Sequence, residues 1–173
     1  MRLTLPALAV AVSLGIGGAA LAADGPSDPQ IAHIAYTAGT IDVAAGKQAL
    51  AKSHNAAVRQ FASEMVRDHE AVNDKALALV KQLKVTPQDN PTSQALAKGA
   101  AAELKTLAPL KGAAFDRAYV ANEVAFHKTV NGALQSTLIP SAHNAQLKSL
   151  LETGLTLFRE HQMHAEHLAG ELK

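Results

Sequence analysis

The chain has 173 residues and a nearly balanced charge, with 16 lysines and arginines against 15 aspartates and glutamates. This balance gives no support to nucleic acid as a partner. Hydrophobic residues make up 48% of the chain and aromatic residues 3%, a composition that favours an all-α protein over a β-sandwich. The absence of cysteine excludes disulfides, thiolate metal ligands and a cysteine nucleophile.

The first residues have the pattern of an export signal. Arg2 is a short basic region, an apolar run follows from Leu3 to Gly18, and Ala20-Leu21-Ala22 is a small-x-small cleavage site. We expect cleavage of residues 1–22, which leaves a single domain over residues 23–173. An uncleaved membrane anchor is the alternative, although the apolar run is short for spanning a bilayer. The expected location is the periplasm, with no integral membrane segment after processing and with loose outer-membrane association left open.

Proline, glycine and cap residues divide the remaining chain into helices. Asp28 is the expected cap of the first helix, Asn55 of the second and Ser141 of the last. A short amphipathic helix lies between the second and third long helices, and we interpret it as a crossover. The fourth predicted helix should end before Pro140. The predicted ranges are about 29–53, 55–84, 92–107, 113–138 and 141–172.

A histidine interrupts the apolar stripe of three long helices near the middle of each. These residues are His69, His127 and His161. Glu123 lies one turn before His127 on the same stripe, and Asp42 lies on the edge of the stripe of the first helix. A single interior histidine is usually a core residue hydrogen-bonded to a neighbour. Three interior histidines in one small core are energetically costly unless they hydrogen-bond to one another or to a carboxylate, or bind a cation.

The pattern therefore predicts a metal centre formed by the three histidines, with Glu123 and Asp42 supplying negative charge. Imidazole and carboxylate ligands suit iron, manganese, zinc or copper. Three further residues are expected around the centre. Asp68 could orient an imidazole, form a surface salt bridge or act as a ligand. The Tyr119 hydroxyl is expected to face the same side as Glu123. His164 is expected at the edge of the centre, or in a surface site with Glu160 or His167.

Two stretches carry a family likeness: Phe61-Ala-Ser-Glu-Met-Val-Arg-Asp-His69, and Phe115-Asp-Arg-Ala-Tyr119 through His127. They resemble an exported bacterial ferritin-like family of unknown function, often labelled "predicted outer membrane protein". The resemblance extends from Asp28 to the C-terminus and implies a ferritin-like four-helix bundle in the periplasm. The family commonly has glutamate where this chain has Asp42, whose shorter side chain reaches less far.

Ferritin-like di-iron sites use Glu-x-x-His pairs, and this chain has none. We therefore expect a mononuclear or degenerate site without ferroxidase activity. The predicted function is metal handling or protection against envelope stress. The alternative is a metal-free structural or interaction protein of the envelope, whose polar core fixes helix register. No catalytic motif is present, which favours a non-enzymatic role, and a homo-oligomer stays open.

Overall fold

The computed structural model describes residues 25–172, and the regular structure of these residues is entirely helical. The predicted all-α class is confirmed. The predicted signal segment, residues 1–22, lies outside the described residues. In chain order the elements are α1 (Asp28–Lys52), α2 (Ala56–Gln82), α3 (Pro91–Leu107), α4 (Gly112–Ala133), the π-helical turn η1 (Leu134–Leu138), α5 (Ile139–Ser141) and α6 (Ala145–Glu171).

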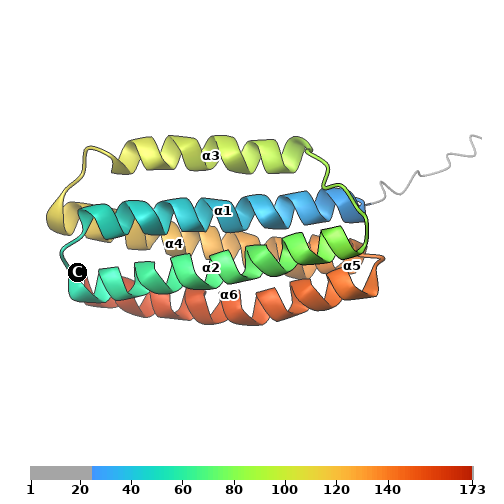
Figure 1. Cartoon of the computed structure of the whole chain (residues 1–173). Helices are drawn as coiled ribbons and strands as arrows, with labels where there is room; N and C mark the ends of the chain where they lie inside the picture. The colour runs from blue at the N-terminus through green and yellow to red at the C-terminus, as the bar shows by residue number, and fades with distance from the viewer. Residues whose placement is uncertain (1–24, 173) are drawn as a thin grey trace, which may run out of the picture.

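The long helices form a bundle in which α1, α2, α4 and α6 lie lengthwise (Figure 1). The most extensive packing joins α1 to α2 and α4 to α6, while α2 also packs on α6 and α3 packs on α1. Figure 1 shows that α3 carries the chain back along the bundle, so that α2 and α4 run in the same direction. Each of the four helices therefore contributes one face to a shared interior.

The helix starts follow from side chains that cap free backbone N–H groups. Asn55 and Asn144 accept hydrogen bonds from the first N–H groups of α2 and α6. The predicted caps Asp28 and Ser141 are wrong. Ser27 caps α1, and the Asp28 carboxylate instead accepts the backbone N–H groups of His143 and Asn144 at 2.9 and 2.8 Å. Asp28 thus ties the start of α1 to the start of α6.

The predicted end of the fourth helix before Pro140 is also wrong. The chain passes from α4 into the wider π turn η1 and then into α5, which contains Pro140 in its first turn. Proline is accepted at that position because the first N–H groups of a helix need no partner within the helix. The π turn widens the backbone beside the apolar side chains of Leu134 and Leu138.

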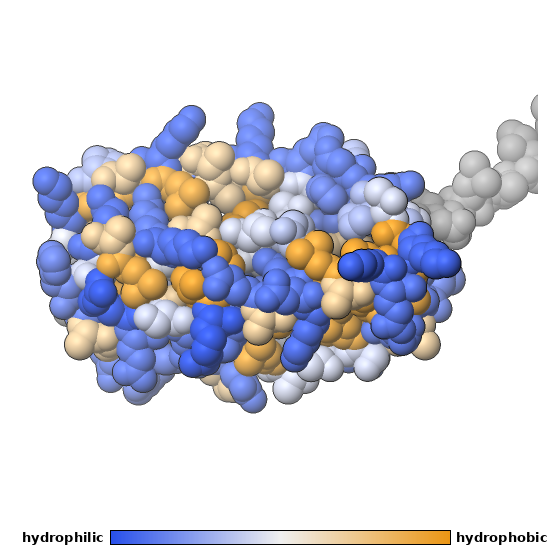
Figure 2. Space-filling model, in the orientation of Figure 1, coloured by the Kyte–Doolittle hydropathy of each residue, from blue (hydrophilic) through white to orange (hydrophobic). Residues whose placement is uncertain are grey.

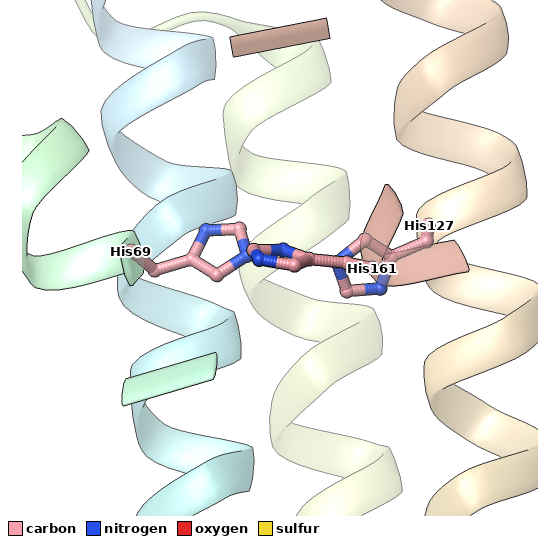
Figure 3. A group of neighbouring side chains, drawn as sticks. All are labelled: His69, His127 and His161. Atoms are coloured by element: carbon pink, nitrogen blue, oxygen red, sulfur yellow. The ribbon is translucent and has the colours of Figure 1, made fainter. Parts of the chain in front are cut away.

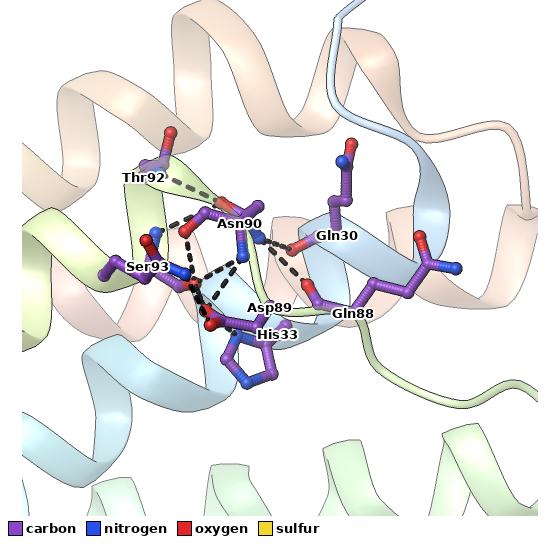
Figure 4. A network of polar contacts seen from close by, with 8 residues as sticks. Gln30, His33, Gln88, Asp89, Asn90, Thr92 and Ser93 are labelled. Carbon is purple, nitrogen blue, oxygen red and sulfur yellow. Dashed lines mark hydrogen bonds and ion pairs between the residues drawn. The ribbon is translucent and has the colours of Figure 1, made fainter.

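The loop before α3 is fastened to the start of α1 by a polar network (Figure 4). The Gln88 N–H donates to the Pro29 carbonyl at 3.0 Å, and the Asn90 side chain donates to the Gln30 carbonyl at 3.4 Å. Asp89 accepts the Ser93 hydroxyl at 2.7 Å. The network holds α3 against α1 at this end of the bundle.

Two apolar clusters lie toward the two ends of the bundle, and a polar layer lies between them. One cluster includes Phe61, Met65 and Phe115, and the other includes Ile31, Leu138 and Leu151. On the face shown in Figure 2, hydrophilic side chains cover most of the surface, with apolar atoms between them. Within residues 25–172, no helix combines the length and the hydropathy that crossing a membrane requires.

Candidate metal centre

The three predicted histidines meet in the middle of the bundle. His69 comes from α2, His127 from α4 and His161 from α6, and Figure 3 shows their rings pointing toward one another. The ring centroids are 5.3 to 5.6 Å apart. One nitrogen from each ring lies within 4.8 Å of the other two. The side chains are 1 to 2% exposed, so the group is shielded from solvent.

Two buried carboxyl groups extend this cluster. Asp42 Oδ2 lies 3.4 Å from His69 Nε2, and Glu123 Oε2 lies 3.5 Å from His127 Nδ1. Asp42, Glu123 and His127 also have ligand-type atoms within 4.8 Å of one another. His127 therefore belongs to both groups, and four helices contribute to one continuous polar layer.

Asp42 is more deeply placed than its position at the edge of the predicted stripe suggests. It is 2% exposed and shares the buried face of α1 with Gly39, Ala45 and Gly46, whereas Ile41 faces α3. The glycines explain the shift, because a face of small residues lets α2 approach α1 closely. The close approach brings the short Asp42 side chain to His69.

Many polar atoms of this layer lack a hydrogen-bond partner among the described residues. They are both nitrogens of His69, Nε2 of His127, Nδ1 of His161 and the hydroxyl of Tyr119. The Glu123 carboxyl has no partner except the neighbouring carboxyl of Asp42. Each unpaired buried group costs about 1–3 kcal/mol, and most such groups in native proteins are satisfied. Their concentration in one layer indicates a site that a cation could satisfy.

Burial controls the protonation of these groups. Desolvation, reinforced by the neighbouring imidazoles, lowers the pKa of His69 well below its usual range and that of His127 to about 4. Burial raises the pKa of Asp42 to about 8, and burial beside Asp42 raises the pKa of Glu123 well above its usual range. Near neutral pH the imidazoles are consequently uncharged and the Asp42 carboxyl holds a proton, while the Glu123 carboxyl is shifted toward its protonated form. A cation binding here would have imidazole lone pairs available and would displace acid protons.

One tautomer of His127 is favoured by its backbone contact. The Nδ1 atom lies 3.0 Å from the Glu123 carbonyl oxygen, to which it can donate a hydrogen bond. That bond leaves the lone pair on Nε2, the nitrogen without a partner. Orientation of a ligand imidazole by a backbone carbonyl is common in metal sites.

At the rim, Asp68 contacts His161, with Oδ2 3.1 Å from Nε2. Arg67 holds the same carboxylate at 2.7 and 2.9 Å, and this pairing is the main reason that the pKa of Asp68 is lowered. Of the roles predicted for Asp68, its geometry suits both the orientation of an imidazole and a salt bridge, the latter with Arg67. Glu64, Asp68 and His161 form a third group with ligand-type atoms within 4.8 Å.

His164 lies at the rim and outside the buried cluster. Its Nδ1 atom is 2.9 Å from Glu64 Oε2, and both side chains are about one-third exposed. His167 contacts Glu171 at 3.3 Å, so the ion-pair partners of these two histidines differ from the predicted surface pairs. Tyr119 is fully buried against Phe61 and Phe115.

Two polar residues of the layer were missed by the sequence analysis. Glu64 lies one turn before Asp68, and this i, i+4 spacing was the available signal. Asn131 lies one turn after His127, where its side chain donates to the Phe158 carbonyl at 3.1 Å and to Gln162 at 2.9 Å. Asn131 joins α4 to α6 directly beside the histidines.

Fold and site together define a helical-bundle protein with a buried layer of imidazoles and carboxyl groups. The chain belongs to the family described as domain of unknown function DUF4142, whose model matches residues 17–168. All five predicted ligand residues fall within the matched range. No curated protein and no solved structure matches the chain.

Proposed function

We propose that this protein binds a transition-metal ion in the buried layer through His69, His127 and His161, with Glu123 and Asp42 compensating the charge. The observation that carries the proposal is the concentration of unpartnered buried polar atoms on these residues. Hydrogen bonding to other residues would be the simplest reason to retain an interior histidine, and His69 has no such bond among the described residues.

The chemistry of the donors restricts the ion. Neutral imidazoles with two carboxylates suit iron, manganese, zinc or copper(II), whereas magnesium and calcium prefer an all-oxygen set. Ionised Asp42 and Glu123 would together balance a divalent charge, which removes the cost of burying an uncompensated ion. No Glu-x-x-His pair contributes to the cluster, so we propose a mononuclear or degenerate centre without ferroxidase activity.

The role that we propose is metal handling or protection against stress in the cell envelope. The proposed architecture is a ferritin-like four-helix bundle with α3 as the crossover, which the parallel direction of α2 and α4 supports. Cleavage of residues 1–22 and location in the periplasm belong to the same proposal, and their support is the sequence pattern of the N-terminus. Loose outer-membrane association and homo-oligomer formation are compatible with it.

A metal-free structural or interaction protein of the envelope is the second candidate. The contact between Asp68 and His161 at 3.1 Å favours it, because Nε2 of His161 is satisfied without an ion. In this candidate the polar layer fixes the register of the helices. It leaves the two nitrogens of His69 unexplained, whereas the Glu123 carboxyl can share a hydrogen bond with the carboxyl of Asp42.

Elemental analysis after exposure to each metal, followed by desalting, tests the proposal. The wild-type protein is compared with a His69→Ala, His127→Ala double variant and with a matched His164→Ala, His167→Ala variant that removes the same number of histidines from the rim. We expect metal in the wild type and in the rim variant, and none in the core variant. Equal metal content in the three proteins, or none in the wild type, would reject the proposal.

A further inference from the structure

A cavity of about 550 Å³ opens beside the histidine layer, at the end of the bundle where α1 begins and α2 ends. Residues of α1, α2, the start of α3, α4, η1 and α6 form its wall, together with Asn90 of the loop before α3. The wall is predominantly apolar and includes Ile34, Val72, Leu79, Leu134, Leu151 and Phe158. Its lining residues include no aspartate, glutamate, lysine, arginine or histidine.

Small residues and the π turn create this space. Ala35, Ala76, Ala133 and Gly154 all line the cavity from different helices, and η1 widens the wall on the α4 side. Protein interiors are normally packed without voids of this size. Several wall residues, including Val72 and Leu79, consequently remain only partly buried. An occupant would complete their packing.

Water is a poor occupant of such a space, because each ordered water needs 2–4 polar partners and the wall supplies few. A charged ligand would enter without a counter-charge, at a large desolvation cost. A docked helix is too large: ten residues at a diameter of 10 Å occupy about 1,200 Å³. The volume instead lies within the usual range for small-molecule sites, about 300–1,000 Å³.

We propose that this cavity binds an uncharged apolar small molecule. Phe158 would form the inner wall of the site. Its ring stacks on His69 with a centroid distance of 4.6 Å and an interplanar angle of 13°. A bound molecule would therefore be separated from the histidine layer by one aromatic ring. The proposal is independent of metal binding, because none of the five predicted ligand residues lines the cavity.

The test is a fluorescence titration with N-phenylnaphthylamine, a neutral apolar probe, in the presence of a chelator. Its sulfonated analogue, anilinonaphthalene sulfonate, has the same aromatic body and a negative charge. We expect saturable binding of the neutral probe and binding of the anion that is weaker by about tenfold or more, equivalent to 1.4 kcal/mol. Ala76→Phe should weaken binding of the neutral probe because the phenyl ring fills the cavity.

Ala78→Phe is the matched control, because Ala78 lies on the same helix but is exposed and outside the cavity. It should bind the probe like the wild type. Circular dichroism shows whether Ala76→Phe folds. If it does not, Ala133→Leu, which fills the cavity from α4, is used as the filling variant. The proposal is overturned if the wild type shows no saturable binding, if the folded filling variants bind as well as the control, or if the anion binds equally well. It is also overturned if light scattering shows a dimer that the filling variants dissociate, since a second chain would then cover the cavity.

Discussion

The carboxyl group of Asp42 and the imidazole of His69 lie 3.4 Å apart between α1 and α2, and both side chains are 2–3% exposed. Burial raises the pKa of the first to about 8 and lowers the pKa of the second. At neutral pH the contact therefore joins a protonated acid to a neutral imidazole, where a surface pair would be charged. This protonation state determines how the layer responds to a cation.

Metal binding at neutral pH should release protons. A metal ion binds the ionised carboxylate, whereas the Asp42 carboxyl holds a proton in the metal-free protein at this pH. Calorimetric titration in two buffers with different ionisation enthalpies measures the number of protons released. An Asp42→Asn variant should release fewer protons than the wild type. Identical buffer dependence in the two proteins would show that Asp42 does not ionise on binding.

The stability of the metal-free protein should decrease as the pH rises above neutrality. The raised pKa of Asp42, about 8, means that this carboxyl binds more protons in the folded than in the unfolded state between about pH 4 and pH 8, so stability falls with pH by up to about 1.4 kcal/mol per unit. The raised pKa of Glu123 acts in the same direction. The lowered pKa values of His69, His127 and His161 act oppositely, but only below the usual histidine pKa of about 6.5. Among the groups of the buried layer, the acids therefore determine the slope above that pH.

Urea unfolding in chelator at several pH values between neutrality and pH 8 measures this slope. The Asp42→Asn, Glu123→Gln variant should lack most of it, because its amides do not titrate. Tyr119, the remaining titratable group beside these acids, has its pKa raised by burial above its usual value of 10.0 and stays protonated throughout. A wild-type slope that the amide variant retains would contradict the assignment.

Replacing His69 and His161 together by leucine should stabilise the metal-free protein. The wild type buries three unpartnered nitrogen atoms on these residues, and their removal should yield about 1–3 kcal/mol after the loss of the Asp68 contact. Thermal unfolding with and without metal separates the two proposed functions. We expect the metal to stabilise the wild type and to leave the leucine variant unchanged. Equal metal responses would favour the metal-free structural role.

The helices and the meeting of the histidines could be predicted from the sequence because both depend on local periodicity. His69, His127 and His161 each replace one apolar residue of a stripe, and stripes of packed helices face one interior. The depth of Asp42 could not be read in this way. It depends on the close approach of α1 and α2, which Gly39 and Gly46 permit and which hydrophobic periodicity does not encode.

Long-range polar contacts account for the other differences from prediction. The carboxylate of Asp28 is used by the start of α6, 115 residues away, and is therefore unavailable as the cap of its own helix. Pro140 is accommodated because a π turn precedes it, and π turns have no strong sequence signal. The cavity beside Phe158 arises from small residues on several helices, none of which is unusual within its own helix.

Gly46→Ala should destabilise the protein through the contact between α1 and α2. An added Cβ atom would lie 2.9 Å from Val66 Cγ2 and 3.0 Å from the Ala62 carbonyl oxygen, and the latter belongs to the helix backbone. Overpacking of this kind costs about 1–3 kcal/mol. Gly99→Ala in α3 is the matched control, because its Cβ would meet no atom within 4 Å, and it should stabilise by about 0.5–1 kcal/mol. Urea unfolding in chelator measures the free energy of unfolding of both variants. An equal loss of stability in Gly99→Ala and Gly46→Ala would show that the close approach of α1 and α2 is not the reason that residue 46 must be glycine. If Gly46→Ala also weakens metal binding, the separation of the two helices sets the reach of Asp42 to the site.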